Sequence, residues 1–163
     1  MEVEFISEPV LSFCQQDIND MKNRAAKNNS GKFRYCFHKN ESSHMQEMMF
    51  VQNKDVYARP HKHIEFDETQ ILIEGTGIVI TFDETGAIHQ TFQVGYKDNK
   101  FWRIQKNIYH MLIPLSEQIV IFEVREGQFS SNSNIFPSWA PKESEHEKVL
   151  SFINNIISKR EEF

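Results

Sequence analysis

The sequence predicts a fold dominated by β-strands, either a closed antiparallel barrel or a β-sandwich, in a single domain with a helix at each end. The chain has 163 residues, of which 39% are hydrophobic and 14 are Phe, and this is enough for one packed core. From about residue 33 to 127, short runs rich in Val, Ile, Phe, Thr and Tyr alternate with turn residues. No long helical pattern separates these runs, which favours antiparallel pairing over a parallel α/β sheet.

The first element is a predicted helix over residues 8–28. Its apolar side chains recur at helical spacing: Leu11, Cys14, Ile18, Met21 and Ala25. The Asn-Asn-Ser-Gly sequence at 28–31 then ends the pattern. We therefore expect residues 1–32 to form a helical segment that packs on the barrel.

The predicted barrel occupies residues 33–127. Turn sequences such as those at 83–86 and 97–100 separate its strands. We expect strands at 33–38, 45–52, 55–60, 69–74, 77–82, 87–94, 101–104, 109–114 and 118–125. Closure into a barrel would remove the exposed edges of such a sheet.

Residues 128–163 are predicted to form an irregular flap, at 128–142, and then a helix. Ser144 and Glu147 have the spacing of a capping box at the start of that helix. The apolar residues that follow share one helical face: Val149, Leu150, Ile153, Ile156 and Ile157. This face must pack either on the barrel or on a second subunit.

Composition excludes several classes of protein. A formal charge of −5 and a pI near 5.8, with no basic stripe, argue against a nucleic acid as partner. No apolar stretch reaches the roughly 20 residues that cross a bilayer, and the acidic start does not resemble a secretory signal, so we expect a cytoplasmic protein with no membrane partner. Cys14 and Cys36 are too few for a disulfide scaffold and are predicted to be reduced thiols.

The residues with a chemical pattern lie between Pro60 and Gly75. His61 and His63 are two residues apart, so in an extended strand both imidazoles point to the same face. A loop of four residues can return Glu68 to the same point. Two nitrogen donors and one carboxylate oxygen suit Zn, Fe, Mn, Ni or Co, with coordination positions left open for water or substrate.

His110, in a later strand, is the predicted fourth ligand. An isolated His-x-His pair is more often a surface or core pair than a metal site. Here the pattern continues with Glu68, with a glycine at a turn that favours positive φ, and with His110 in an antiparallel strand. The complete spacing therefore predicts one divalent transition metal bound by His61, His63, Glu68 and His110.

This spacing resembles the first conserved motif of the cupin superfamily, and His110 stands where the second motif has its histidine. The resemblance implies a double-stranded β-helix, or jelly-roll, barrel over residues 33–127. Cupins usually carry Pro-x-Gly before that histidine, whereas this chain has Gln105-Lys106-Asn107. We expect Asn107 to adopt the left-handed conformation that Gly would supply.

Within the superfamily, the sequence is similar to the WbuC-type cupin-fold metalloproteins over about residues 10 to 141. Cys36 replaces an Asn that is common in the first strand of that group, and the final helix lies outside the resemblance. The motifs that carry the resemblance, in order, are Arg34 with His38, Gln46-Glu47-Met48, Arg59-Pro60-His61-Lys62-His63, Phe82-Asp83-Glu84-Thr85-Gly86, Phe122-Glu123-Val124-Arg125-Glu126-Gly127 and Trp139-Ala140-Pro141.

Tyr57, Arg59 and Glu123 are candidates for ligand binding or catalysis beside the metal. Alternation would place Tyr57 and Arg59 on the face of the two histidines, and an inward Arg suits a carboxylate or phosphate. A buried ion pair of Arg59 with Glu123 or Glu74 satisfies the same pattern. Glu123 is a candidate general base, with a structural salt bridge as the alternative.

Three further residues are candidates for contact with a substrate. Arg34 belongs to the motifs quoted above. His38 could donate to the site, although a hydrogen-bonded core histidine is the more common outcome. Trp139 lies in the predicted flap and could cover the barrel mouth.

The resemblance also implies a functional context. It points to bacterial surface polysaccharide biosynthesis, including O-antigen and lipopolysaccharide, with an anionic or sugar-like small molecule, such as a nucleotide-sugar derivative, as ligand and a homodimer as assembly. The residues specify no reaction. They leave open a metal-dependent isomerase, epimerase or oxygenase, a non-catalytic ligand-binding or regulatory protein with a structural metal, and, less well supported because of Glu68 and His110, a metal-free epimerase.

Overall fold

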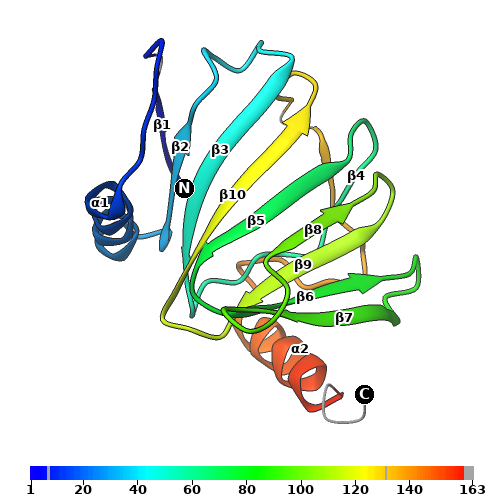
Figure 1. Cartoon of the computed structure of the whole chain (residues 1–163). Coiled ribbons are helices and arrows are strands. Elements are labelled where there is room, and N and C mark those ends of the chain that lie inside the picture. Colours follow the sequence, from blue (N-terminus) through cyan, green and yellow to red (C-terminus); the bar gives the residue numbers. More distant parts are fainter. Residues whose placement is uncertain (7, 131, 160–163) are drawn as a thin grey trace.

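A computed structural model describes residues 1–6, 8–130 and 132–159 and places one helix against each of two β-sheets (Figure 1). The helices are α1 (Gln15–Lys27) and α2 (His146–Lys159). The strands are β1 (Glu2–Phe5), β2 (Lys32–Cys36), β3 (Met45–Asn53), β4 (Lys62–His63), β5 (Glu68–Glu74), β6 (Gly77–Phe82), β7 (Ile88–Val94), β8 (Phe101–Ile104), β9 (Tyr109–Pro114), β10 (Gln118–Glu126) and β11 (Asn134–Ile135).

The larger sheet has six strands in the order β1-β2-β3-β10-β5-β8, and the smaller has three in the order β7-β6-β9. β4 pairs separately with β11. Among the strands of the described residues, β1 and β2 pair in parallel and the other neighbours are antiparallel. Sequence-distant strands such as β3 and β10 are neighbours, which is the arrangement of a jelly roll. The predicted all-β barrel with two helices is confirmed.

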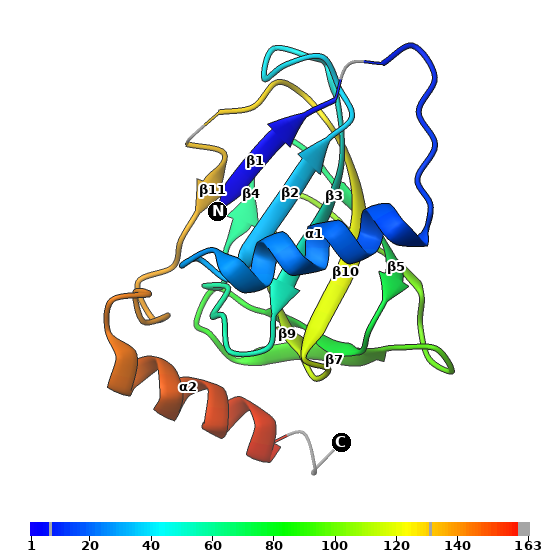
Figure 2. The same cartoon turned by 90° about the vertical axis from the view of Figure 1, so that its left-hand side faces the viewer.

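α1 covers the outer face of the larger sheet, where it lies across β2 and β3 (Figure 2). Met21 and Ala25 on the helix are fully buried against Phe33 and Val51 of these strands. Apolar residues at helical spacing thus meet alternate residues of the strands, and burial of their surface stabilises the contact.

α2 covers the smaller sheet. Ile156 of the helix packs with Ile78, Ile80 and Phe82 of β6, on the face that points away from the larger sheet. A third apolar cluster occupies part of the space between the two sheets. Its buried members are Leu72, Val79, Val94, Trp102, Ile104, Ile119 and Ile121.

The starts of both helices differ from the sequence prediction: α1 begins later, and α2 is capped by other residues. α1 begins at Gln15 and not at residue 8, because the carboxylate of Asp17 accepts a hydrogen bond from the backbone N–H of Cys14 (2.7 Å) and caps the helix there. The predicted capping box of Ser144 and Glu147 is wrong. The backbone N–H of Lys142 donates to the carboxylate of Glu145 (2.8 Å) instead, and α2 begins after that turn.

Two strand predictions also differ from the structure. Residues 55–60 form no strand: the Tyr57 hydroxyl and the Arg59 guanidinium bind backbone carbonyls of the segment before α2, so side chains hold this stretch in place of a ladder. β1 was not predicted, and neither were the short paired strands β4 and β11. The two acidic residues of β1, Glu2 and Glu4, form ion pairs with Arg24 on α1, which stabilise an edge strand whose side chains are all exposed.

Several local predictions are confirmed. Asn107 has a φ of 67° and Gly75 a φ of 97°. A Cβ at Gly75 would approach the backbone oxygen of Gln118 to 2.5 Å, so this turn requires glycine on two grounds. Both cysteines are free thiols, with Cys14 exposed and Cys36 buried. Neither helix of the described residues is long and apolar enough to cross a membrane.

Candidate metal centre

Three histidines from two neighbouring segments converge at one end of the space between the sheets. The backbones of His61 and His110 form a reciprocal pair of hydrogen bonds, of 3.1 and 2.9 Å, so the two residues lie directly opposite each other. Their ring centroids are 4.6 Å apart, and His63 follows on the same side of β4. One ring nitrogen from each of the three lies within 4.8 Å of the others.

Glu68, the first residue of β5, completes the cluster. Its Oε1 lies 3.0 Å from Nε2 of His110 and its Oε2 lies 3.2 Å from Nε2 of His63. Two donors that each bind one ion at about 2.1 Å and at right angles are about 3.0 Å apart, so these separations are those of ligands to a common metal. The four predicted metal ligands therefore come together.

The remaining ring nitrogens orient two of the imidazoles. Nδ1 of His61 lies 3.0 Å from the carbonyl oxygen of Arg59, and Nδ1 of His110 lies 2.9 Å from that of Ile108. A proton on each Nδ1 satisfies these carbonyls and leaves the Nε2 lone pair for a metal. Nε2 of His110 is buried and faces Oε1 of Glu68 at 3.0 Å, so the atom left free for a metal points at the carboxylate of the same cluster.

Electrostatics favour the metal-binding protonation states of His61 and Glu68. Burial, with a smaller contribution from neighbouring His110, lowers the pKa of His61 to about 3, so this imidazole is neutral at pH 7. Burial opposes ionisation of Glu68, but the charge and the hydrogen bonds of His110 and His63 hold the pKa of Glu68 well below its ordinary value. Burial disfavours the charged form of His110, yet Glu68 raises its pKa overall, so metal binding would release a proton from this pair.

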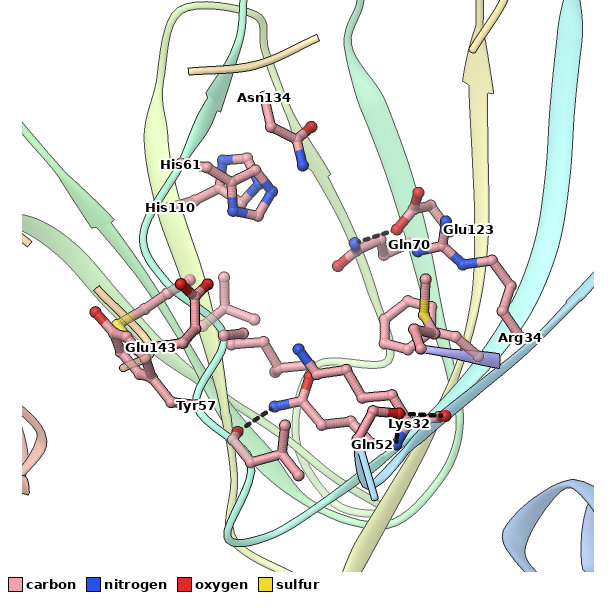
Figure 3. A pocket seen from close by; sticks show the side chains of 18 of the residues that line it. Lys32, Arg34, Gln52, Tyr57, His61, Gln70, His110, Glu123, Asn134 and Glu143 are labelled. Atoms are coloured by element: carbon pink, nitrogen blue, oxygen red, sulfur yellow. Dashed lines mark hydrogen bonds between the residues drawn. The ribbon is translucent and has the colours of Figure 1, made fainter. Parts of the chain in front are cut away.

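The cluster opens into a cavity of about 840 Å³ between the two sheets. Figure 3 shows His61 and His110 side by side, across the cavity from Gln70 and Glu123. The side-chain amide of Gln70 donates hydrogen bonds to Oε1 of Glu68 (3.2 Å) and to Oε2 of Glu123 (2.9 Å). A metal ligand and a second buried carboxyl group are thus joined through one side chain.

Glu123 faces the cavity, as predicted from alternation along β10. Burial, and after it the charge of Glu68, raises the pKa of Glu123 above its ordinary value. No ion pair of Glu123 within 4.0 Å occurs in the part of the chain that the structure describes. The alternative of a direct structural salt bridge is therefore wrong.

Tyr57 and Arg59 are held by the segment before α2. Tyr57 lines the cavity, but its hydroxyl donates to the carbonyl oxygen of Pro141 (3.2 Å). Arg59 does not line the cavity: it donates to the carbonyl oxygens of Pro137 (2.8 Å) and Ala140 (3.1 Å). The ion pairs of Arg59 considered above, with Glu123 or Glu74, are absent from the described residues, because these backbone carbonyls take their place.

Two further candidates lie away from the cavity. Nδ1 of His38 lies 3.0 Å from the carbonyl oxygen of Glu47, and its ring packs edge-on against Phe5. Trp139 packs on Phe82 beneath α2, and its indole N–H donates to the carbonyl oxygen of Glu84 (3.2 Å). Trp139 therefore does not cover the barrel mouth, because its large apolar ring completes the cluster under the helix.

The sequence analysis missed Gln70 and Arg125, although a signal for both existed. Gln70 lies two residues after Glu68 in β5, and Arg125 lies two residues after Glu123 in β10. In a strand, such neighbours share a face. Alternation from Glu68 and Glu123 would therefore have placed both side chains in the cavity. Arg34, which was a candidate from the sequence, also lines it.

Solved structures share this fold. A protein of Shewanella oneidensis, determined by X-ray crystallography, matches with a TM-score of 0.58 and 11% identity over 72% of this chain and 82% of its own. The capsular polysaccharide assembling protein CapF of Staphylococcus aureus matches with a TM-score of 0.55 and 16% identity, over 64% of this chain and 31% of CapF. This chain thus spans about a third of CapF. The fold is that of the cupins.

A search of curated proteins returned no match. Residues 13–94 match the profile of a family described as a domain of unknown function, DUF6016. The match includes three of the four residues of the metal centre, His61, His63 and Glu68, and ends before His110. Since it takes in about half of the sequence, the chain belongs to the DUF6016 family.

Proposed function

We propose that this protein is a metal-binding cupin of the WbuC type that binds a small, polar, anionic molecule at a divalent transition metal. The observation that carries the proposal is the convergence of His61, His63 and His110 within 4.8 Å, with the carboxylate of Glu68 beside two of them. Three imidazoles and one carboxylate are a donor set typical of Zn, Fe, Mn or Ni.

The cavity supports a small-molecule ligand. A volume of about 840 Å³ lies in the usual range for such ligands, about 300–1,000 Å³, and a sugar derivative would fit. One wall carries apolar side chains, such as Val79 and Leu112, and the other carries Gln70, Glu123 and Arg125. Apolar surface with a few convergent polar groups is typical of a binding pocket.

The chain's own residues can support chemistry at this point. When bound, a divalent metal would act as a Lewis acid toward an oxygen atom of the ligand. Gln70 fixes the position of Glu68 through its amide hydrogen bond. Glu123, whose pKa is raised, can hold a proton where it faces the cavity and so act as a general acid or base toward the ligand.

We further propose that the ligand belongs to surface polysaccharide biosynthesis and that the protein is a cytoplasmic homodimer. Support for the biosynthetic context comes from the WbuC-type motifs and from the fold shared with CapF, a capsular polysaccharide assembling protein. A sugar or nucleotide-sugar derivative would present the hydroxyl and anionic groups that suit the polar wall. Light scattering of the purified protein tests the dimer, and one subunit in solution would contradict it.

A second candidate function is a non-catalytic ligand-binding or regulatory protein whose metal is structural. Glu68 lies within 3.2 Å of both His63 and His110, so the four side chains could saturate a tetrahedral ion. X-ray absorption spectroscopy of the metal-loaded protein separates the two functions. Five or six donor atoms indicate open positions for a ligand, whereas a four-coordinate zinc site indicates a structural metal.

Metal content tests the site itself. Protein purified without a His tag should contain one equivalent of metal, measured by mass spectrometry, and the double variant His61→Ala/His63→Ala should contain none. The matched control is His44→Ala/His89→Ala, which removes two exposed imidazoles. Circular dichroism confirms that each variant folds. Stoichiometric metal in the first double variant, or loss of metal in the control, contradicts the proposed site.

A further inference from the structure

The arginines of the described residues fall into two groups. Arg24 and Arg103 form ion pairs with carboxylates, and Arg59 donates to two backbone carbonyls. Arg34 and Arg125 form neither an ion pair nor a hydrogen bond within the described part of the chain. The Nε of each is buried without a partner, as is that of Arg59, but Arg59 is bound through its Nη2. Arg34 and Arg125 are also the arginines that line the cavity.

Aromatic rings hold both guanidinium groups while leaving their donors free. The Cζ of Arg125, a residue with 7% exposure, lies 4.4 Å from the ring centroid of Phe66 and 5.9 Å from that of Phe129. The Cζ of Arg34 lies 5.8 Å from the ring centroid of Phe50. Cation–π contacts of this kind orient a guanidinium but accept none of its N–H groups in the plane.

Both side chains lie near the metal centre. Arg125 in β10 is the cross-strand neighbour of Glu68 in β5, so their Cβ atoms are about 5 Å apart. Arg34 extends from β2 toward Gln70 and Glu123 (Figure 3). A small molecule with one atom bound at the metal could therefore place an anionic group between the two guanidinium groups.

The protein does not neutralise these two cations. Each guanidinium has five N–H donors, and burial of a charged donor without an acceptor is costly. Glu123 is near both, but it forms no ion pair with either, and its Oε2 already accepts a hydrogen bond from Gln70. Glu68, the cross-strand neighbour of Arg125, lies against His63 and His110 and forms no ion pair with either arginine among the described residues. The donors of both guanidinium groups therefore remain available to an anion in the cavity.

We infer that Arg34 and Arg125 form an anion-binding subsite, which holds a phosphoryl or carboxylate group of the ligand. Planar guanidinium groups bind both kinds of anion through paired N–H donors. The inference of the subsite rests on the geometry of the two arginines. The inference that the same ligand also binds the metal rests on the proposed function.

Anion binding to the metal-free protein tests the subsite independently of the metal. The full chain, stripped with a chelator, is titrated with inorganic phosphate and, separately, with acetate, and binding is followed by NMR chemical shifts. We expect saturable binding of at least one anion, and the tighter of the two identifies the group that the subsite prefers. Arg34→Gln and Arg125→Gln should each weaken that binding by about tenfold or more, since each removes a charged donor.

The control is Arg103→Gln, which removes an exposed guanidinium that pairs with Asp67 and should leave anion binding unchanged. If a Gln variant does not fold, Arg34→Lys and Arg125→Lys keep the charge but lose the planar fork, and should still weaken binding. Absence of saturable binding of both anions, or equal binding by wild type and the cavity variants, overturns the subsite. Neither result affects the metal content that tests the proposed function.

Discussion

The two faces of the larger sheet differ although the same strands form both. On the outer face, Phe33 and Val51 are fully buried beneath Met21 and Ala25 of α1. On the inner face, polar and charged residues from β2, β3, β5 and β10 alternate with these apolar ones and line the cavity. They are Lys32, Arg34, Gln52, Glu68, Gln70, Glu123 and Arg125.

This difference separates stability from function. Apolar burial on the outer face contributes favourable free energy of folding. The buried charges of the inner face cost free energy unless a metal or a ligand compensates them. Substitutions of the apolar residues of the outer face should therefore lower stability and leave binding intact. Substitutions of the charged residues of the inner face should weaken binding without lowering the stability of the metal-free protein.

The largest effect on stability is expected from Phe33→Ala. Phe33 has no exposed surface, and its loss leaves a cavity between α1 and the sheet. We expect the free energy of unfolding of the metal-free protein to fall by about 3–5 kcal/mol in urea titrations. The control is Phe101→Ala, at a ring with 62% exposure, which should change it by less than about 1 kcal/mol. The folded Phe33→Ala protein should still bind one metal. Loss of metal would contradict the separation of stability on the outer face from binding on the inner face.

On the inner face, Glu68→Gln is expected to affect metal binding most. The substitution keeps the size of the side chain but replaces the charged carboxylate with a neutral amide, which is a much weaker ligand for a transition metal. Loss of a residue outside the ligand set typically costs 10–100-fold in metal affinity, so loss of a ligand should cost at least about 100-fold. Competition with a chromophoric chelator measures the affinity. The exposed Glu117→Gln serves as control, and equal affinity of Glu68→Gln and wild type would remove Glu68 from the site.

The sequence predicts the convergence of the candidate metal ligands well because strand alternation and loop length are local. His61 and His63 share a face whatever the rest of the fold does, and the short loop to Glu68 leaves few alternatives. His110 was predicted from its position in a later antiparallel strand, and the cupin resemblance agrees with that prediction. The structure adds the reason for its place, which is the hydrogen-bonded backbone pair with His61.

The sequence fails where an interaction depends on segments far apart. Arg59 has the spacing of a cavity residue, but the carbonyls of Pro137 and Ala140 bind it. β1 alternates polar and apolar residues, but its four side chains are exposed, and Glu2 and Glu4 pair with Arg24 of α1. Neither the backbone carbonyls nor the ion pairs leave a mark in local composition, so only the tertiary structure reveals them.

Glu123→Gln tests the cost of a buried charge on the inner face, because removal of that charge should make the metal-free protein more stable. The folded-state pKa of Glu123 lies above the ordinary value of 4.5, since burial disfavours its charge. Its contribution to stability is therefore complete below about pH 4.5 and is lost as the pH rises through the raised pKa. Gln can still accept the hydrogen bond from Gln70 and avoids this loss.

We expect the Glu123→Gln variant to equal wild type near pH 4 and to exceed it by about 1 kcal/mol at pH 8, measured by urea unfolding. The exposed Glu126→Gln should show no such difference between the two pH values. A Glu123→Gln variant that is less stable than wild type at pH 8 would mean that the charge of Glu123 stabilises the fold.

The smallest effect on stability and binding is expected from His38→Ala. His38 belongs neither to the apolar outer-face residues nor to the residues that line the cavity. Burial lowers the pKa of His38, so its contribution to stability is present above about pH 6.5 and is lost as the pH falls through the lowered pKa. Loss of its hydrogen bond with the backbone of Glu47 should cost about 1 kcal/mol at pH 8 and less at pH 5. Because His38 does not line the cavity, affinities for metal and phosphate should stay within about twofold of wild type. A tenfold loss of either affinity would instead place His38 with the cavity residues, which is the alternative that the sequence left open, and would show that the inner-face set extends beyond the end of β2.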